Sequence, residues 1–211
     1  TLEAIAGEKA GIIKPGIPVV VGRYQPETVE VFRKKASEME APLILAEEEY
    51  ELSETLVRGD VQCITVISEH VTETCALPLT GLAQQENLTT VLASVKQLRQ
   101  GQYKISEAAL HHGIENLVEQ TGLTGRWQKI ADRPHVFCDT AHNKDGIQQV
   151  VRQIRQGEYR HVHVVWGMVN DKNTREVLEL LPADATYYFT QAAIPRALHV
   201  YDLMKAARET G

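Results

Sequence analysis

The feature that most constrains the fold is a regular alternation of two kinds of segment after Gly122. Short apolar runs rich in β-branched and aromatic residues predict strands, and segments with apolar residues at helical spacing predict helices. The expected strands are 135–138, 162–166 and 186–190, and the expected helices are 144–155, 174–181 and 199–208. Because strands that alternate with helices form parallel sheets, this half is predicted to be an α/β domain.

The first half contains the same kinds of segment in a less regular order. The side chain of Thr1 can cap a first helix that ends at Gly11, and Pro15 and Gly16 then turn the chain. The remaining expected helices are 26–40, 83–98 and 106–117, and the expected strands are 17–22, 43–45, 61–67 and 71–77. With 211 residues and 43% hydrophobic residues, the chain can form two cores, and the boundary is expected near 118–124.

Charge and composition exclude several classes of partner. A net charge of −6 and an isoelectric point near 5.8 argue against nucleic acids and anionic membranes, which need a concentrated basic face. No apolar run is long enough to span a bilayer and the first residues do not resemble a signal peptide, so the expected location is the cytoplasm. The acidic run at 47–49 is expected to be a solvated surface loop.

The three cysteines do not predict a metal or disulfide site. Cys63, Cys75 and Cys138 are odd in number and lack the paired spacing of a zinc or redox motif. Cys63 and Cys138 lie in apolar runs, so both are expected to be buried, reduced thiols. His111 and His112 lie in a predicted helix, and His161 and His163 alternate on one face of a predicted strand. A metal site from these histidines would need a third ligand that the sequence does not identify.

Polar clusters follow each of the three strands predicted in the second half. They are Asp139 to Asn143, Gly167 to Lys172, and Gln191 together with Ile194 to Arg196. Ligands of open parallel sheets bind beyond the carboxyl ends of the strands, so these clusters predict a binding site at one edge. The alternative is that Asp139 and Asn143 only cap the following helix.

Four motifs, in order along the chain, resemble those of the folylpolyglutamate synthase family, the folate branch of the Mur-type ligases. They are Glu8-Lys9-Ala10-Gly11, the Gln-x-x-Asn element ending at Asn87, Gly125-Arg126 followed by Asp139-Thr140-Ala141-His142-Asn143, and Asp171-Lys172. The resemblance implies an α/β chain in which the end of a central ATPase domain (1–120) precedes a Rossmann-like, parallel-sheet C-terminal ligase domain (121–211). Both domains are expected to be incomplete.

The same resemblance assigns nucleotide contacts to three residues. Asn87 would contact the adenine of ATP, Arg126 its phosphates and Asp139 its ribose. These roles suit the side chains, because a carboxamide donates and accepts, a guanidinium binds phosphate oxygens in pairs, and a carboxylate accepts from hydroxyls.

Two further residues of the third motif are implied to bind or process substrate. His142 and Asn143 would receive glutamate or position the acyl intermediate, and His142 could accept a proton from the incoming amine. The alternative for His142 is that it orients neighbouring loops.

The resemblance also implies that Lys9 carries a carbamate that holds Mg²⁺ in the intact enzyme. This modification needs a neutral amine, whereas the alternative is an exposed helix lysine near a glutamate. The sequence contains no G-x-x-x-x-G-K-[ST] phosphate loop. We therefore expect an unmodified Lys9 and no ligase activity in this chain alone.

The implied function is an ATP-dependent amide ligase that adds L-glutamate to folate through an acyl phosphate. Dihydropteroate is a second implied substrate, since related enzymes combine this activity with dihydrofolate synthase activity. Two alternatives stay open: a non-catalytic nucleotide-binding fragment, and a Mur ligase that acts on a cell-wall peptide precursor. The sequence does not predict an oligomeric state.

Overall fold

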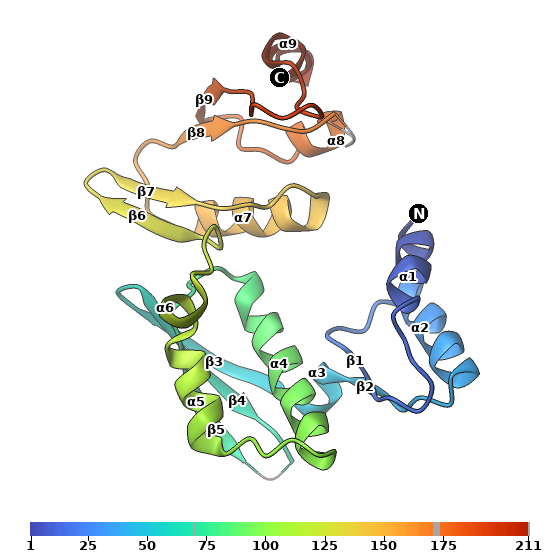
Figure 1. Ribbon diagram of the computed structural model, residues 1–211. Helices are drawn as coiled ribbons and strands as arrows, with labels where there is room; N and C mark the ends of the chain where they lie inside the picture. The colour runs from blue at the N-terminus through green and yellow to red at the C-terminus, as the bar shows by residue number, and fades with distance from the viewer. Residues whose placement is uncertain (70, 171–173, 211) are drawn as a thin grey trace. The chain divides into compact units, whose positions relative to one another are not determined.

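The computed structural model describes residues 1–69, 71–170 and 174–210, so the Asp171-Lys172 pair lies outside the described residues. The chain divides into two compact units, Thr1–Thr124 (unit 1) and Gly125–Gly211 (unit 2). Each unit has its own buried apolar cluster and is described by itself (Figure 1).

Unit 1 begins with two helices and a pair of parallel strands. These elements are α1 (Leu2–Ala10), β1 (Val19–Val21), α2 (Pro26–Glu38) and β2 (Leu43–Leu45). The hydroxyl of Thr1 accepts a hydrogen bond from the N–H of Ala4 at 3.2 Å, which confirms the predicted cap. Ala10 of α1 and Ala36 of α2 are buried in one cluster together with Ile13 from the turn after α1.

An antiparallel sheet forms the second part of unit 1. Its order is β3 (Glu51–Arg58), β4 (Val61–Ile67) and β5 (Thr72–Leu77). Strand β3 was not expected, because most of its side chains are exposed and its sequence lacks a regular apolar alternation. The acidic run is not a loop as expected but the short helix α3 (Ala46–Glu49).

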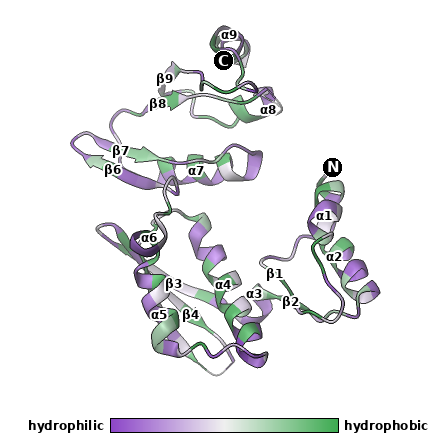
Figure 2. Ribbon diagram, in the orientation of Figure 1, coloured by the Kyte–Doolittle hydropathy of each residue, from purple (hydrophilic) through white to green (hydrophobic). Residues whose placement is uncertain are grey.

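Three helices complete unit 1 (Figure 1). They are α4 (Ala83–Gln100), α5 (Glu107–Glu115) and α6 (Leu117–Thr121). Ser106 caps α5 as predicted, since its hydroxyl accepts from the N–H of Ala109 at 3.1 Å. Both α4 and α5 carry hydrophilic and hydrophobic residues (Figure 2). Their apolar faces bury Leu88, Leu92 and Leu110 against β4 and β5.

Unit 2 contains one antiparallel and one parallel pair of strands. Its elements are β6 (Gln128–Asp132), β7 (His135–Cys138), α7 (Lys144–Gln156), β8 (His163–Trp166), α8 (Thr174–Leu178), β9 (Thr186–Phe189) and α9 (Val200–Thr210). Strands β8 and β9 form the predicted parallel pair, whereas β7 pairs with β6, which the sequence pattern did not reveal. The α/β class is confirmed, with a core built around Ile147, Val151 and Val177.

The three cysteines differ in how deeply they are buried. Cys75 is fully buried, but Cys63 is only partly buried and Cys138 is exposed, so the predicted burial of Cys138 is wrong. Three of the four β7 residues are exposed, which explains the error.

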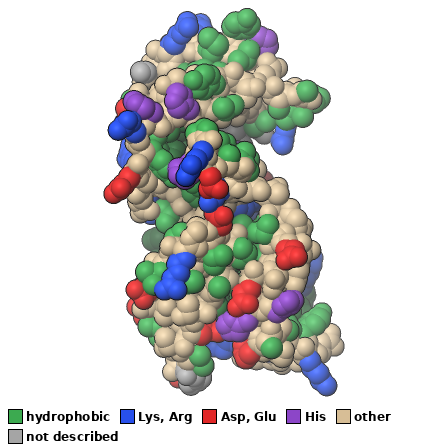
Figure 3. Space-filling model, turned by 90° about the vertical axis from the view of Figure 1, so that its left-hand side faces the viewer, with side chains coloured by type: hydrophobic (Ala, Val, Ile, Leu, Met, Phe, Trp, Pro, Cys, Tyr) green, Lys and Arg blue, Asp and Glu red, His purple; other side chains and the backbone are tan. Residues whose placement is uncertain are grey.

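Acidic and basic side chains are interspersed on the face in Figure 3. No described helix is both long and apolar enough to cross a membrane.

A buried glutamine fixes the loop that leads into α4. The side chain of Gln62 is fully buried in β4, and its amide donates to the carbonyl oxygens of Leu79 and Gly81, the latter at 3.4 Å. Its Oε1 accepts from the side chain of Gln85 at 3.3 Å. The start of α4 is therefore joined to the sheet by polar contacts inside the core.

We expect Gln62→Leu to lower the free energy of unfolding by about 1–3 kcal/mol, because buried carbonyl oxygens lose their donor. Urea unfolding followed by circular dichroism measures this change. The control is Gln102→Leu at an exposed position, for which we expect a change within about 0.5 kcal/mol. Equal effects at the two positions would contradict the role of the buried amide.

Candidate functional site

The two halves of the third motif, Gly125-Arg126 and Asp139 to Asn143, lie against each other in unit 2. The N–H of Thr140 donates to the carbonyl oxygen of Gly125 at 3.0 Å, and the Thr140 hydroxyl donates to the same oxygen at 3.1 Å. Residues 125–127 and 139–143 therefore form one structure, called here the paired loops. The first loop precedes β6 and the second follows β7, so the β6–β7 hairpin brings them together.

The carboxylate of Asp139 holds the paired loops in register. Its Oδ2 accepts from the N–H of Trp127 and its Oδ1 accepts from the N–H of Ala141, both at 2.7 Å. Asp139 is therefore not a helix cap. Asn143 is the cap of α7, since its Oδ1 accepts from the N–H of Gly146 at 2.8 Å.

Arg126 is exposed, and one terminal nitrogen of its guanidinium is held by the paired loops. Its Nη1 donates to the carbonyl oxygen of Gly125 at 3.2 Å and to the hydroxyl of Thr140. A guanidinium has five N–H donors, so most of them stay available for an anion. Fixing a charged side chain before an anion binds reduces the entropy lost on binding.

Residues that follow all three strands line one cavity of about 460 Å³ in unit 2. The lining residues are Ala141 and His142 after β7, Trp166 to Val169 at the end of β8, and Thr190 to Ala192 with Arg196 after β9. The polar clusters do meet at one cavity, but β7 pairs with β6 and not with β8, so the expectation that they share the edge of a single sheet is wrong. The cavity carries an imidazole and a guanidinium, which suits an anionic ligand.

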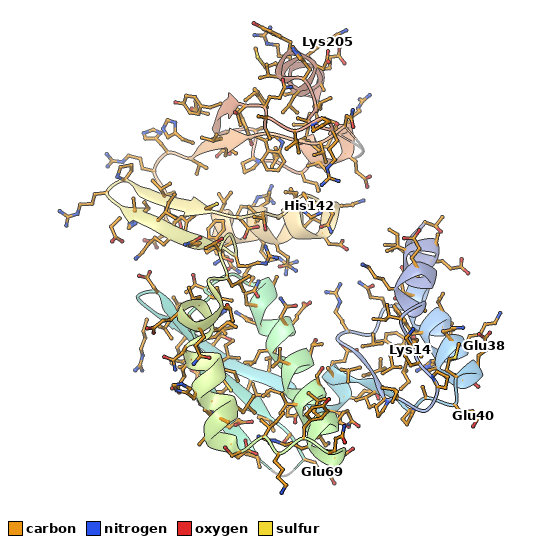
Figure 4. The ribbon with its side chains drawn as sticks, in the orientation of Figure 1. Lys14, Glu38, Glu40, Glu69, His142 and Lys205 are labelled. Carbon is orange, nitrogen blue, oxygen red and sulfur yellow. The ribbon has the colours of Figure 1, made fainter. Side chains whose placement is uncertain are left out.

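The hydrogen bond of His142 fixes its tautomer. Its Nδ1 lies 3.0 Å from the carbonyl oxygen of Thr140, in the loop between β7 and α7 (Figure 4). A carbonyl oxygen only accepts hydrogen bonds, so Nδ1 must carry a proton. In the neutral ring, Nε2 is then left unprotonated and can accept a proton.

The two predicted site residues of unit 1 lie on different helices. Asn87 is exposed on α4, and its Nδ2 donates to Oε1 of Gln84 at 3.0 Å. Both amides border a mostly apolar cavity of about 360 Å³, whose lining includes Leu88, Ile105 and Leu110. A flat ring with polar edges suits such a cavity, because its faces find apolar contacts and its edge finds an amide.

Lys9 is exposed on α1. A protonated amine repels a cation, so Lys9 without modification does not fit a magnesium site. The described residues contain one group of three potential metal ligands, and no residue of α1 belongs to it.

Comparison with known proteins agrees with this geometry. Residues 125–211 match the Mur ligase, glutamate ligase domain. The dihydrofolate synthase/folylpolyglutamate synthase of Bacillus subtilis is 30% identical over 98% of this chain and 48% of its own length. The chain is a homologue of the folylpolyglutamate and dihydrofolate synthases.

Solved structures extend the similarity to the fold of both units. Folylpolyglutamate synthase of Mycobacterium tuberculosis, complexed with ADP and AMPPCP, matches 99% of this chain with a TM-score of 0.86 and 27% identity. The Escherichia coli protein in complex with DHPP and ADP matches with a TM-score of 0.79 and 27% identity, also over 99% of this chain. The chain spans about half the length of these homologues, 48% and 47% respectively.

Two residues that contact Gly125 in unit 2 were missed by the sequence reasoning. Thr140 occupies the variable position of the Asp-x-Ala-His-Asn motif, and a motif comparison gives that position no role. The Oε1 of Gln128 accepts from the N–H of Gly125 at 3.0 Å. The only available signal was that Thr140, which carries a hydroxyl, follows Asp139 directly in the motif.

The conformation of Gly125 requires the absence of a side chain. Its φ is +69°, and a Cβ at this position would lie 2.6 Å from Cγ2 of Thr140. We expect Gly125→Ala to destabilise unit 2 by at least about 1–2 kcal/mol, because of left-handed backbone strain added to this overlap.

Thr140→Ser removes the overlapping methyl group but keeps the hydroxyl. The double variant Gly125→Ala/Thr140→Ser should therefore recover part of the lost stability, and a thermal unfolding double-mutant cycle measures the coupling. Additive effects would show that the two side chains do not compete for this space.

Proposed function

We propose that the intact protein is an ATP-dependent ligase that adds L-glutamate to folate, a tetrahydrofolylpolyglutamate synthase. The observation that carries this proposal is the position of Arg126, fixed by Thr140 in the paired loops of a glutamate ligase domain. The names of the homologues support the folate substrate over a cell-wall peptide precursor.

The proposed reaction has two steps. A substrate carboxylate takes the γ-phosphoryl group of ATP, which gives an acyl phosphate and ADP. The amine of glutamate then attacks the acyl carbon, an amide forms, and phosphate leaves. Arg126 contributes positive charge near the phosphoryl oxygens, and such fixed charges supply most of the catalysis in phosphoryl transfer. The complexes of two homologues with ADP support the use of ATP.

His142 is proposed to accept the proton that the glutamate amine loses. Its unprotonated Nε2 and its place in the lining of the unit 2 cavity support this role. Asn143, which caps α7, is proposed to help bind the same substrate from the adjacent position.

Nucleotide contacts are proposed for Asn87 and Asp139. Asn87 would bind the adenine at the apolar cavity beside α4. Each oxygen of the Asp139 carboxylate accepts one N–H bond, which leaves further lone pairs that can accept from ribose hydroxyls. Asp139 would then both shape the paired loops and hold the sugar.

Lys9 is proposed to hold Mg²⁺ as a carbamate in the intact enzyme, where the ion would neutralise phosphate charge. Without that modification the side chain does not fit the ion.

The proposed ligase function makes residues 1–120 the end of a central ATPase domain and residues 121–211 a C-terminal ligase domain, in a cytoplasmic enzyme. Dihydropteroate is proposed as an additional acceptor, because the names of several homologues include dihydrofolate synthase.

The second candidate function is nucleotide binding without catalysis by this chain alone. It is favoured by the exposed Lys9 and by the lack of a phosphate-loop motif in the 211 residues.

We expect the full-length protein to lengthen folate only when ATP and glutamate are both present, with one ADP formed per glutamate added. Product masses and a coupled ADP assay measure this. The present chain should show no turnover, since it lacks the phosphate loop. Turnover by the present chain would contradict the second candidate, and absence of activity in the full-length protein would refute the ligase assignment.

In the full-length enzyme we expect His142→Gln to lower kcat by about 10²–10⁴-fold, because glutamine can keep the bond to Thr140 but cannot accept the proton. Steady-state kinetics of glutamate addition measures this change. His161→Gln, at an exposed position outside the cavity lining, is the control and should leave kcat unchanged. An unchanged kcat in His142→Gln would leave His142 only an orienting role.

A further inference from the structure

A separate cluster of potential metal ligands lies in unit 1, between β5 and α5. Glu73 and Cys75 are two residues apart on β5, so their side chains point to the same face of the strand. His111 of α5 faces them, with its Nε2 3.0 Å from Oε2 of Glu73. One donor atom from each of the three residues lies within 4.8 Å of the other two.

We propose that Glu73, Cys75 and His111 form a binding site for a transition-metal dication, and that Zn²⁺ fits the site best. The donor set combines a carboxylate oxygen, a sulfur and an imidazole nitrogen, which are the three kinds of ligand that Zn²⁺ takes in proteins. Magnesium and calcium select oxygen donors, so a thiol and an imidazole argue against them.

The spacing of the donor atoms is close to that of a zinc centre. With bonds of about 2.0–2.3 Å, a tetrahedral site places its ligand atoms roughly 3.3–3.7 Å apart. The histidine and glutamate atoms are already near this separation, and rotation of side chains can bring the sulfur closer. Three protein ligands leave a fourth position for water, as in zinc sites that are open to solvent.

A bound dication would balance the negative charges of its ligands. When a zinc ion binds, the S–H bond breaks, an S–Zn bond forms and one proton is released. Zn²⁺ with one thiolate and one carboxylate is neutral overall, which lowers the cost of burying the charges.

Access and packing are also compatible with a bound ion. The side chains of Glu73 and His111 are 23% and 33% exposed, so an ion can enter from solvent, whereas Cys75 is fully buried in the main core of unit 1. Histidine and acidic side chains lie next to each other in the lower half of the face in Figure 3. A bound ion would join α5 to β5, and so add a cross-link to the core of unit 1.

The competing arrangement is an ion pair between protonated His111 and Glu73, which needs no sulfur. The test is titration of the metal-free chain with Co²⁺, whose complexes with thiolates absorb strongly in the near ultraviolet. We expect one equivalent to bind with a sulfur-to-cobalt band, and Zn²⁺ to displace it. Cys75→Ser should abolish the band, and His111→Ala should weaken binding at least tenfold.

The matched controls are His112→Ala, next to His111 but exposed, and Cys63→Ser, and both should bind cobalt as the unmodified chain does. If Cys75→Ser does not fold, Glu73→Gln keeps the side-chain shape and should also weaken binding. Zinc should raise Tm of the unmodified chain but not of His111→Ala. The proposal is overturned by the absence of a band in the unmodified chain, by a band that persists in Cys75→Ser, or by equal effects of His111→Ala and His112→Ala.

Discussion

The Asp139 carboxylate is the contact on which the geometry of the candidate site depends. It accepts one backbone N–H from each of the paired loops, and so sets the distance between them. The bonds of Thr140 to Gly125 and Arg126 are possible only when the loops have this register. A negative charge that accepts two N–H bonds is a strong fixing contact, because charge-assisted bonds are stronger than neutral ones. The backbone of these loops therefore determines where the side chains of the candidate site lie.

Local sequence signals predicted many of the helices and strands. The strands that were missed depend on pairing between segments, which a local pattern does not reveal. The cap at Thr1 and the strand 43–45 were predicted from neighbouring residues, since caps and short apolar runs are local features. Strand β3 is mostly exposed, so nothing in its own sequence required burial. Strand β6 was missed because β7 was expected to belong to a parallel sheet, and its antiparallel partner precedes it across a tight turn.

The candidate site was likewise predicted in part from the sequence, and the remaining contacts depend on how the chain folds. The order of the motifs predicted that Arg126 and Asp139 belong to one site, and the strand pattern predicted that His142 lies near the residues that follow β8 and β9. The sequence could not show that Asp139 accepts from Trp127, because that bond depends on how the β6–β7 hairpin closes. The sequence did not predict the cluster of Glu73, Cys75 and His111 either, because the long helix α4 separates β5 from α5 along the chain.

The bond from His142 to Thr140 has one more consequence. Because Nδ1 keeps its proton and its partner in both charge states of the ring, gain or loss of a proton at Nε2 breaks no hydrogen bond. The imidazole can therefore change its charge without changing its orientation. Little reorganisation would accompany each proton transfer, and the ring would return to its starting state without resetting the loop that holds it.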